Sequence, residues 1–237
     1  DISTCEGSST AIEFPIPMAG LETPFAATFS GGSAFVARGE CSGAAIGTCP
    51  TNDESIITAE GLTLTGDFST LKRSTDYIWR VGDELRFHDL NSEFCLQSTA
   101  VAISSGDEAT ISVDLRRSGG FMEADDYISI YSIIDGVETL ERTYSGQIPA
   151  YNQRFTKSGI TGSTVAIKVC VKNGDGAFGI GGVDGPLEHY AISDMRVLIT
   201  PPLPTYRFYD ADPGAGPATE LANGYSYDPG TTADSRT

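Results

Sequence analysis

The chain has 237 residues and carries 15 Lys and Arg against 32 Asp and Glu, which gives a formal net charge of −17. A charge this negative repels phosphate and anionic lipid headgroups, so neither nucleic acid nor a membrane surface is expected as a partner. Hydrophobic residues make up 40% of the chain, enough for a packed core, and no apolar run approaches the ~18 residues of a membrane-spanning helix. The first residues, Asp1–Cys5, lack the basic head and apolar run of a signal peptide, so a mature form or a fragment is expected.

Segments rich in Val, Ile, Thr, Tyr and Phe, bounded by Gly, Asn, Asp and Pro, recur along the chain. In Ala109–Arg116 the apolar residues Ile111, Val113 and Leu115 alternate with polar ones, as in an antiparallel strand with one buried face. No stretch of a dozen residues has a helical period, so we expect an all-β, antiparallel β-sandwich of jelly-roll type. The predicted strands, in chain order, are Thr10–Phe14, Phe25–Phe29, Ser33–Arg38, Ser55–Ala59, Leu62–Gly66, Tyr77–Val81, Glu84–Asp89, Glu93–Gln97, Ala109–Arg116, Tyr127–Ile133, Thr139–Ser145, Val165–Lys172 and Tyr190–Ile199.

Two turns can be assigned from their residues. Asp135-Gly136 lies between predicted strands and has the residue pair of a type I′ hairpin, in which both central residues take positive φ. Asn173-Gly174 has the same chemistry and is predicted to end the strand before it in the same way.

The five cysteines favour disulfides over a metal site, because none forms a C-x-x-C pair. Cys41 and Cys49 flank a short, flexible segment that closes easily into a disulfide loop. Cys95 and Cys170 lie in predicted strands, where the alternatives are a bridge across the core or two buried free thiols. Cys5 has no assigned partner. Disulfides persist in oxidising compartments, so an extracellular or cell-surface location is expected.

A domain boundary is predicted at the Pro-rich spacer 201–204, which follows a jelly-roll-like sandwich over residues 1–200. The remaining segment, residues 205–237, has too few apolar residues to form a stable domain alone. It opens with Tyr206, Phe208 and Tyr209, and no second strand is evident in it. The segment is therefore expected to be either a flexible tail or the first piece of a second β domain. In the second case, other copies or neighbouring modules are expected to supply its backbone and apolar partners.

The tail resembles the opening of Ig-like repeats in very long surface and adhesion proteins of Bacteroidota, through Tyr206–Pro213, Leu221–Pro229 and Thr231–Asp234. Residues 1–200 resemble, more weakly, jelly-roll modules of the same secreted proteins. That similarity is carried by Met122–Tyr131, Asp135–Glu138 and Tyr190–Val197. The resemblance implies a modular, exported and non-catalytic architecture, and it implies no single ligand.

A calcium site is expected where Glu123, Asp125 and Asp126 precede a strand, with Asp194 in the last predicted strand. Jelly rolls often tie a loop to the final strand through one Ca²⁺ held by carboxylate and carbonyl oxygens. The alternative is a solvated acidic turn.

Aromatic residues suggest where a sugar could bind, since sugars require flat apolar surfaces with amides and charged groups nearby. Tyr77 and Trp79 share one face of a predicted strand, and we assign that face to the core, with a sugar platform as the alternative. Tyr151 is the best candidate for an exposed aromatic ligand contact, with Asn152 and Arg154 to bond hydroxyls. The alternative for these three residues is a loop rim that binds nothing.

Catalytic patterns are weak. Gly174–Gly179 matches G-x-G-x-x-G, but the segment after it cannot form the helix that a dinucleotide site requires. His88 is expected on the surface of its strand and His189 at the start of the last one, so neither is assigned as a base. A glycosidase needs only two carboxylates at the right separation, and 32 acidic residues leave that alternative open.

The sequence therefore predicts a non-catalytic extracellular module that serves adhesion or the assembly of a surface fibre. The alternative is a carbohydrate-binding module attached to a secreted polysaccharide-degrading enzyme. The expected partners are other copies or modules of the same surface protein, or a polysaccharide.

Overall fold

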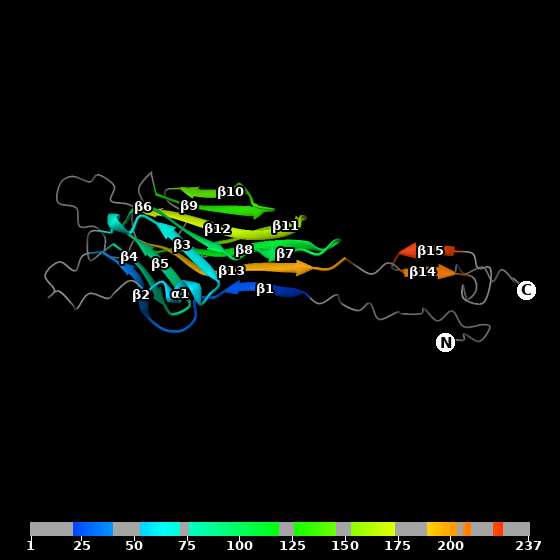
Figure 1. Ribbon diagram of the computed structural model, residues 1–237, viewed down its shortest axis with the longest axis horizontal. Helices are drawn as coiled ribbons and strands as arrows, with labels where there is room; N and C mark the ends of the chain where they lie inside the picture. The colour runs from blue at the N-terminus through cyan, green and yellow to red at the C-terminus, as the bar shows by residue number, and fades with distance from the viewer. Residues whose placement is uncertain are drawn as a thin grey trace, which may run out of the picture. The chain divides into compact units, whose positions relative to one another are not determined.

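The computed structural model describes residues 21–39, 53–71, 76–118, 126–145, 153–173, 189–202, 206–209 and 220–224 (Figure 1). The chain divides into two compact units. Gly20–Pro201 forms one unit, and the strands β14 (Tyr206–Tyr209) and β15 (Glu220–Gly224) belong to the other. The boundary lies at the start of the Pro-rich spacer. Among the described residues, no helix is long and apolar enough to cross a membrane.

The larger unit consists of two antiparallel sheets packed face to face (Figure 1). Sheet A has seven strands in the order β11-β8-β13-β5-β4-β2, with β1 also paired to β13. Its strands are β1 (Glu22–Ala27), β2 (Ala34–Arg38), β4 (Tyr77–Val81), β5 (Glu84–His88), β8 (Glu108–Ser118), β11 (Gln153–Ile160) and β13 (His189–Thr200). Sheet B has six strands in the order β10-β9-β12-β6-β3, with β7 also paired to β12. Its strands are β3 (Leu62–Gly66), β6 (Leu90–Ser98), β7 (Val101–Ala102), β9 (Tyr127–Ile134), β10 (Val137–Ser145) and β12 (Thr164–Asn173).

The strand order confirms the predicted jelly roll. In chain order, β5, β6, β8, β9, β10, β11, β12 and β13 alternate between the sheets, except that the hairpin β9–β10 stays in sheet B. The first of these eight strands lies beside the last in sheet A, and the second lies beside the seventh in sheet B. Such nesting of early strands against late ones is the jelly-roll arrangement of two antiparallel sheets. The core between the sheets is built from alternate residues, such as Ile111 and Val113 of β8, which are fully buried as predicted.

One predicted strand is wrong. Ser55–Ala59 forms a short helix, α1 (Ser55–Thr58), whose first turn is held by a hydrogen bond from the Ser55 N–H to Asp53 Oδ1. Ile56 and Ile57 are both buried, whereas a strand would point these neighbours to opposite faces. Conversely, β11 was not predicted, because few apolar residues alternate in an edge strand such as this one. The predicted strand Thr10–Phe14 lies outside the described residues.

The Asp135-Gly136 hairpin is confirmed, with φ of 51° and 81° at its two residues. The same prediction at Asn173 is wrong, because Asn173 does not have positive φ and is the last residue of β12. Its buried side chain donates a hydrogen bond to the Phe87 carbonyl at 3.2 Å and so ties sheet B to sheet A. Gly174 lies outside the described residues.

The disulfide between Cys95 and Cys170 is present. The two cysteines are direct register partners on the neighbouring strands β6 and β12. Phe94 and Leu96, on either side of Cys95, point into the core, so the bridge lies on the outer side of sheet B. The expectation that it crosses the core is therefore wrong. Cys5, Cys41 and Cys49 lie outside the described residues.

The tail supplies a strand partner of its own. Tyr206–Tyr209 pairs antiparallel with Glu220–Gly224, with Tyr206 opposite Gly224. The expectation that Tyr206, Phe208 and Tyr209 lie in a segment with no second strand is therefore wrong. The ten residues between the two strands are rich in Gly, Pro and Ala, and this long connection is why the sequence did not reveal the pairing.

An ion pair joins the two sheets where β10 and β11 form their edges. Lys157 Nζ lies 2.6 Å from Glu141 Oε1, which also accepts a hydrogen bond from Ser132 Oγ. Burial raises the pKa of the Glu141 carboxyl, but the contacts with Lys157 and Ser132 outweigh it, and the pKa lies below its ordinary value. A carboxyl with a lowered pKa stabilises the fold above its unfolded-state pKa and loses that contribution as the pH falls through the folded-state pKa.

Replacing Glu141 by Gln is therefore expected to lower the free energy of unfolding by about 1 kcal/mol at pH 7, with the difference vanishing in acid. Urea unfolding at pH 7 and at successively lower pH measures it. Glu138→Gln is the control, because the Glu138–Lys168 pair is more exposed and its loss is expected to have a smaller effect. A Glu141→Gln deficit that stays constant down to pH 2 would contradict the assignment.

Candidate functional site

The outer side of sheet A carries an unusual set of side chains for so acidic a chain. On β4, Ile78 is buried in the core while Tyr77 and Trp79 point to the other side, and on β5 Arg86 alternates with core residues in the same way. We call this surface the arginine–aromatic face; it consists of Phe35, Arg38, Tyr77, Trp79, Glu84, Arg86, His88, Asp114, Arg116, Arg154, Asp194 and Arg196. The assignment of Tyr77 and Trp79 to the core is therefore wrong.

A row of stacked groups crosses β2, β4 and β5. Phe35 and Trp79 are register partners whose rings stack with centroids 5.3 Å apart, and Trp79 is in turn the register partner of Arg86. The Arg86 guanidinium lies 5.9 Å from the indole centroid, and that of Arg38 lies 4.8 Å from the Phe35 centroid. The indole N–H donates to Ser33 Oγ at 3.0 Å. The rings are thus held between cations in a fixed stack.

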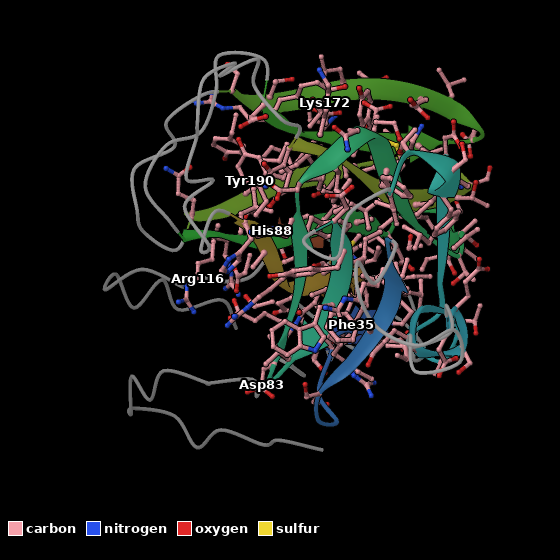
Figure 2. All side chains as sticks on the ribbon, turned by 90° about the vertical axis from the view of Figure 1, so that its left-hand side faces the viewer. Phe35, Asp83, His88, Arg116, Lys172 and Tyr190 are labelled. Carbon is pink, nitrogen blue, oxygen red and sulfur yellow. A yellow bond between two sulfur atoms is a disulfide. The ribbon has the colours of Figure 1, made fainter. Side chains whose placement is uncertain are left out.

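A second row lies beside the first. Tyr77 stacks on His88 with ring centroids 4.7 Å apart, and His88 Nδ1 lies 3.3 Å from Asp89 Oδ2. His88 is only 3% exposed, so the prediction that it lies on the surface is wrong; Tyr77 lies over it. Burial raises the pKa of the Tyr77 hydroxyl, and the Arg86 charge opposes that shift. Figure 2 places Phe35, His88 and Arg116 at the end of the sandwich that faces the viewer.

Arginines and carboxylates continue the face across β13, β8 and β11. Glu84 accepts hydrogen bonds from Arg86, with its Nε at 3.1 Å, and from Arg116 at 3.3 Å. Asp114 accepts two hydrogen bonds of 2.6 Å from Arg154. Asp194 is paired with Arg196 at 2.7 Å and lies 3.7 Å from Arg154. The side chains of Arg116, Arg154 and Arg196 remain 46%, 59% and 43% exposed.

The face differs in charge from the rest of the protein. Among the described residues, the face carries five guanidinium groups, from Arg38, Arg86, Arg116, Arg154 and Arg196, and three carboxylates, from Glu84, Asp114 and Asp194, with Asp89 beside His88. The chain as a whole has a formal net charge of −17. Within the described ranges, the arginine–aromatic face is therefore richer in arginine than the acidic chain as a whole.

The expected calcium site stays a prediction, because part of it lies outside the described residues. Glu123 and Asp125 lie outside the described residues, and Asp126 is fully buried before β9. Asp194 is paired with Arg196 at 2.7 Å and lies 3.7 Å from Arg154. Within the described ranges, the only three potential ligands that gather are Glu93, Cys95 and Cys170, and the disulfide leaves the two cysteines without thiolates to offer.

Of the expected sugar contacts, Arg154 lies in β11 on the arginine–aromatic face, while Tyr151 and Asn152 lie outside the described residues. Sequence reasoning missed Phe35, Arg86, Arg116 and Arg196. The one sequence signal that pointed to this face was the alternation along Tyr77–Val81, because it places Tyr77 and Trp79 on the same side of the strand.

No protein-family model matches the sequence, and no curated protein matches it. Solved structures give weak similarity. A family 61 carbohydrate-binding module, TmCBM61, solved with β-1,4-galactotriose, has 13% identity and a TM-score of 0.35, with 58% of this chain and 81% of that chain covered. An endo-1,3-β-glucanase from Streptomyces sioyaensis has 12% identity and a TM-score of 0.41, with 80% and 100% covered. The family 32 module of C. perfringens NanJ, solved with galactose, has 16% identity and a TM-score of 0.29, with 60% and 96% covered. Similarity at this level supports no inference about ligand or activity.

Proposed function

We propose that the chain is a non-catalytic carbohydrate-binding module of an exported protein, and that a polysaccharide lies along the arginine–aromatic face. The observation that carries the proposal is the face itself: three aromatic rings and five arginines aligned on neighbouring strands. The six strands from β11 to β2 are separated by five steps of about 4.8 Å, so the face extends over roughly 24 Å. That width suits a chain of several sugar rings.

The chemistry of the face suits hydroxyl-rich ligands. Sugar hydroxyls both donate and accept hydrogen bonds, and here guanidinium donors alternate with carboxylate acceptors. The groups stand on strands and are fixed by stacking or ion pairs, so little side-chain entropy is lost on binding. Each of Glu84, Asp114 and Asp194 accepts hydrogen bonds from arginine, an arrangement for holding a ligand rather than for donating a proton as a general acid.

Export is supported by the Cys95–Cys170 disulfide, since such bonds persist in oxidising compartments and are rare in most cytosols. The adhesion or fibre-assembly role depended on a tail strand without a partner. Because β14 pairs with β15 of the same chain, we favour the carbohydrate-binding role.

Replacing Trp79 by Ala is expected to weaken polysaccharide binding at least tenfold, because the stack that positions Arg86 and Phe35 is lost. Affinity gel electrophoresis against a panel of neutral and acidic polysaccharides measures it, with circular dichroism to verify folding. Tyr131→Ala is the matched control: Lys168 lies 5.3 Å from the Tyr131 ring, but on sheet B. No binding of the unaltered protein to any polysaccharide, or equal losses in both variants, would refute the proposal.

A further inference from the structure

We infer that the polysaccharide bound on the arginine–aromatic face is polyanionic, with carboxylate or sulfate groups recognised by Arg116, Arg154 and Arg196. This inference depends on the proposed function and specifies the class of its ligand.

The aromatic row does not offer what neutral sugars use. A neutral sugar packs its C–H face against an open ring face. The Trp79 indole is flanked by the Phe35 ring and the Arg86 guanidinium, and Phe35 has Arg38 over it. The rings therefore act as spacers that hold guanidinium groups in place. A planar guanidinium held in this way matches the two oxygens of a carboxylate or sulfate.

The exposed arginines retain donors for such a ligand. Each guanidinium has five N–H donors on three nitrogens. Arg116 contacts Glu84 through Nη1 alone, Arg196 contacts Asp194 through Nε alone, and Arg154 contacts Asp114 through Nε and Nη2. The carboxylates thus orient the three side chains without using all of their donors.

Their positions follow from the sheet register. Arg154 lies opposite Asp114, which stands two residues before Arg116 on β8, and Arg196 lies opposite Ser112 on the same strand. Residues two apart on a strand share a face at about 6.6 Å, and neighbouring strands are about 4.8 Å apart. The three guanidiniums therefore belong to one patch and can contact successive charged sugars.

Charge complementarity selects this ligand class in spite of the net charge of the chain. At physiological ionic strength the Debye length is about 8 Å, so the arginines of the face govern contact more than distant acidic residues do. A nucleic acid fits less well, because its bases need open ring faces on which to stack and its phosphates would meet Glu84, Asp114 and Asp194. Sugar hydroxyls can instead donate to those carboxylates.

The test uses polymers that differ only in charge: polygalacturonate against its fully methyl-esterified form, and dextran sulfate against dextran. Affinity electrophoresis of the full chain is expected to show at least tenfold tighter binding to one or both acidic polymers than to their neutral forms, with retardation that weakens as NaCl is raised. Equal binding to neutral and acidic forms, or to neutral forms alone, overturns the inference and leaves the proposed function standing. Binding to none of the polymers in this test or in the wider panel overturns both. Equal binding to a single-stranded oligonucleotide indicates an unselective polyanion surface and overturns the inference.

The double variant Arg116→Gln/Arg154→Gln is expected to lose tenfold or more in affinity for the acidic polymer and to keep its melting temperature within a few degrees, since both side chains are exposed. The control Arg142→Gln/Lys168→Gln removes the same charge from sheet B, and its affinity is expected to change less than threefold. Equal losses in the two variants would assign the effect to net charge and overturn the inference.

Discussion

Replacing Cys95 and Cys170 together by Ala is expected to lower the free energy of unfolding of the sandwich by about 4 kcal/mol. The disulfide closes a loop with a sequence separation of 75 residues, and the entropy that such a bond removes from the unfolded chain grows with loop length. A loss of this size is a large part of the stability of an ordinary domain.

Urea unfolding measures this prediction, with the fluorescence of Trp79, the single tryptophan, as a probe located in the sandwich. Gln97→Ala, at an exposed position of β6 two residues from Cys95, is the control, and its unfolding midpoint is expected to match that of the unaltered chain. The unaltered chain unfolded in the presence of a reductant should resemble the double variant. Unchanged midpoints in both cases would show that the bridge contributes nothing to stability in solution.

Alternation along the strands predicted most of the fold, because a half-buried strand places apolar residues at every second position. Leu62–Gly66 and Tyr77–Val81 were predicted with the bounds that the structure shows. Alternation with a period of two places Tyr77 and Trp79 on the same side of the strand, but it does not say which side of the strand faces the core. The strand has only five residues, and its two aliphatic residues, Ile78 and Val81, lie on opposite sides, so the sequence leaves that choice open. In the structure, Ile78 is the one that packs in the core. The burial of His88 depends on a ring from the neighbouring strand and so has no local signal.

The arginine–aromatic face could be predicted only in part. Its arginines come from strands as distant in sequence as β2 and β13, and they become neighbours through the jelly-roll strand order rather than through any motif. The Cys95–Cys170 bond shows the same limit. The bridge was one of two alternatives that the sequence left open, and its location within one sheet depends on β12 lying directly beside β6.

The second large effect is expected at Phe94, which is fully buried and packs edge-on against Phe68 at 5.2 Å between ring centroids. Phe94→Ala is expected to lower the free energy of unfolding by about 4 kcal/mol, through lost burial and the cavity that remains. The ring of Phe94 also fills the position beside Gly66, its register partner on β3. A Cβ added at Gly66 would lie 2.3 Å from Phe94 Cδ1, so Gly66→Ala is expected to lower the stability by about 2 kcal/mol.

The two substitutions are expected to be strongly non-additive. Without the Phe94 ring the Gly66 methyl group meets no clash, so Gly66→Ala should have no cost, or a slight gain, in the Phe94→Ala background. Urea unfolding of the four proteins in the cycle gives the coupling energy, expected to be about 2 kcal/mol. Gly82→Ala serves as the control: Gly82 has φ of +62° and no neighbour within 4 Å of an added Cβ, so its effect comes from the backbone and should be the same in both backgrounds. Additive effects of Gly66→Ala and Phe94→Ala would mean that the phenyl ring does not occupy the space beside Gly66, and the packing of β3 against β6 would have to be revised.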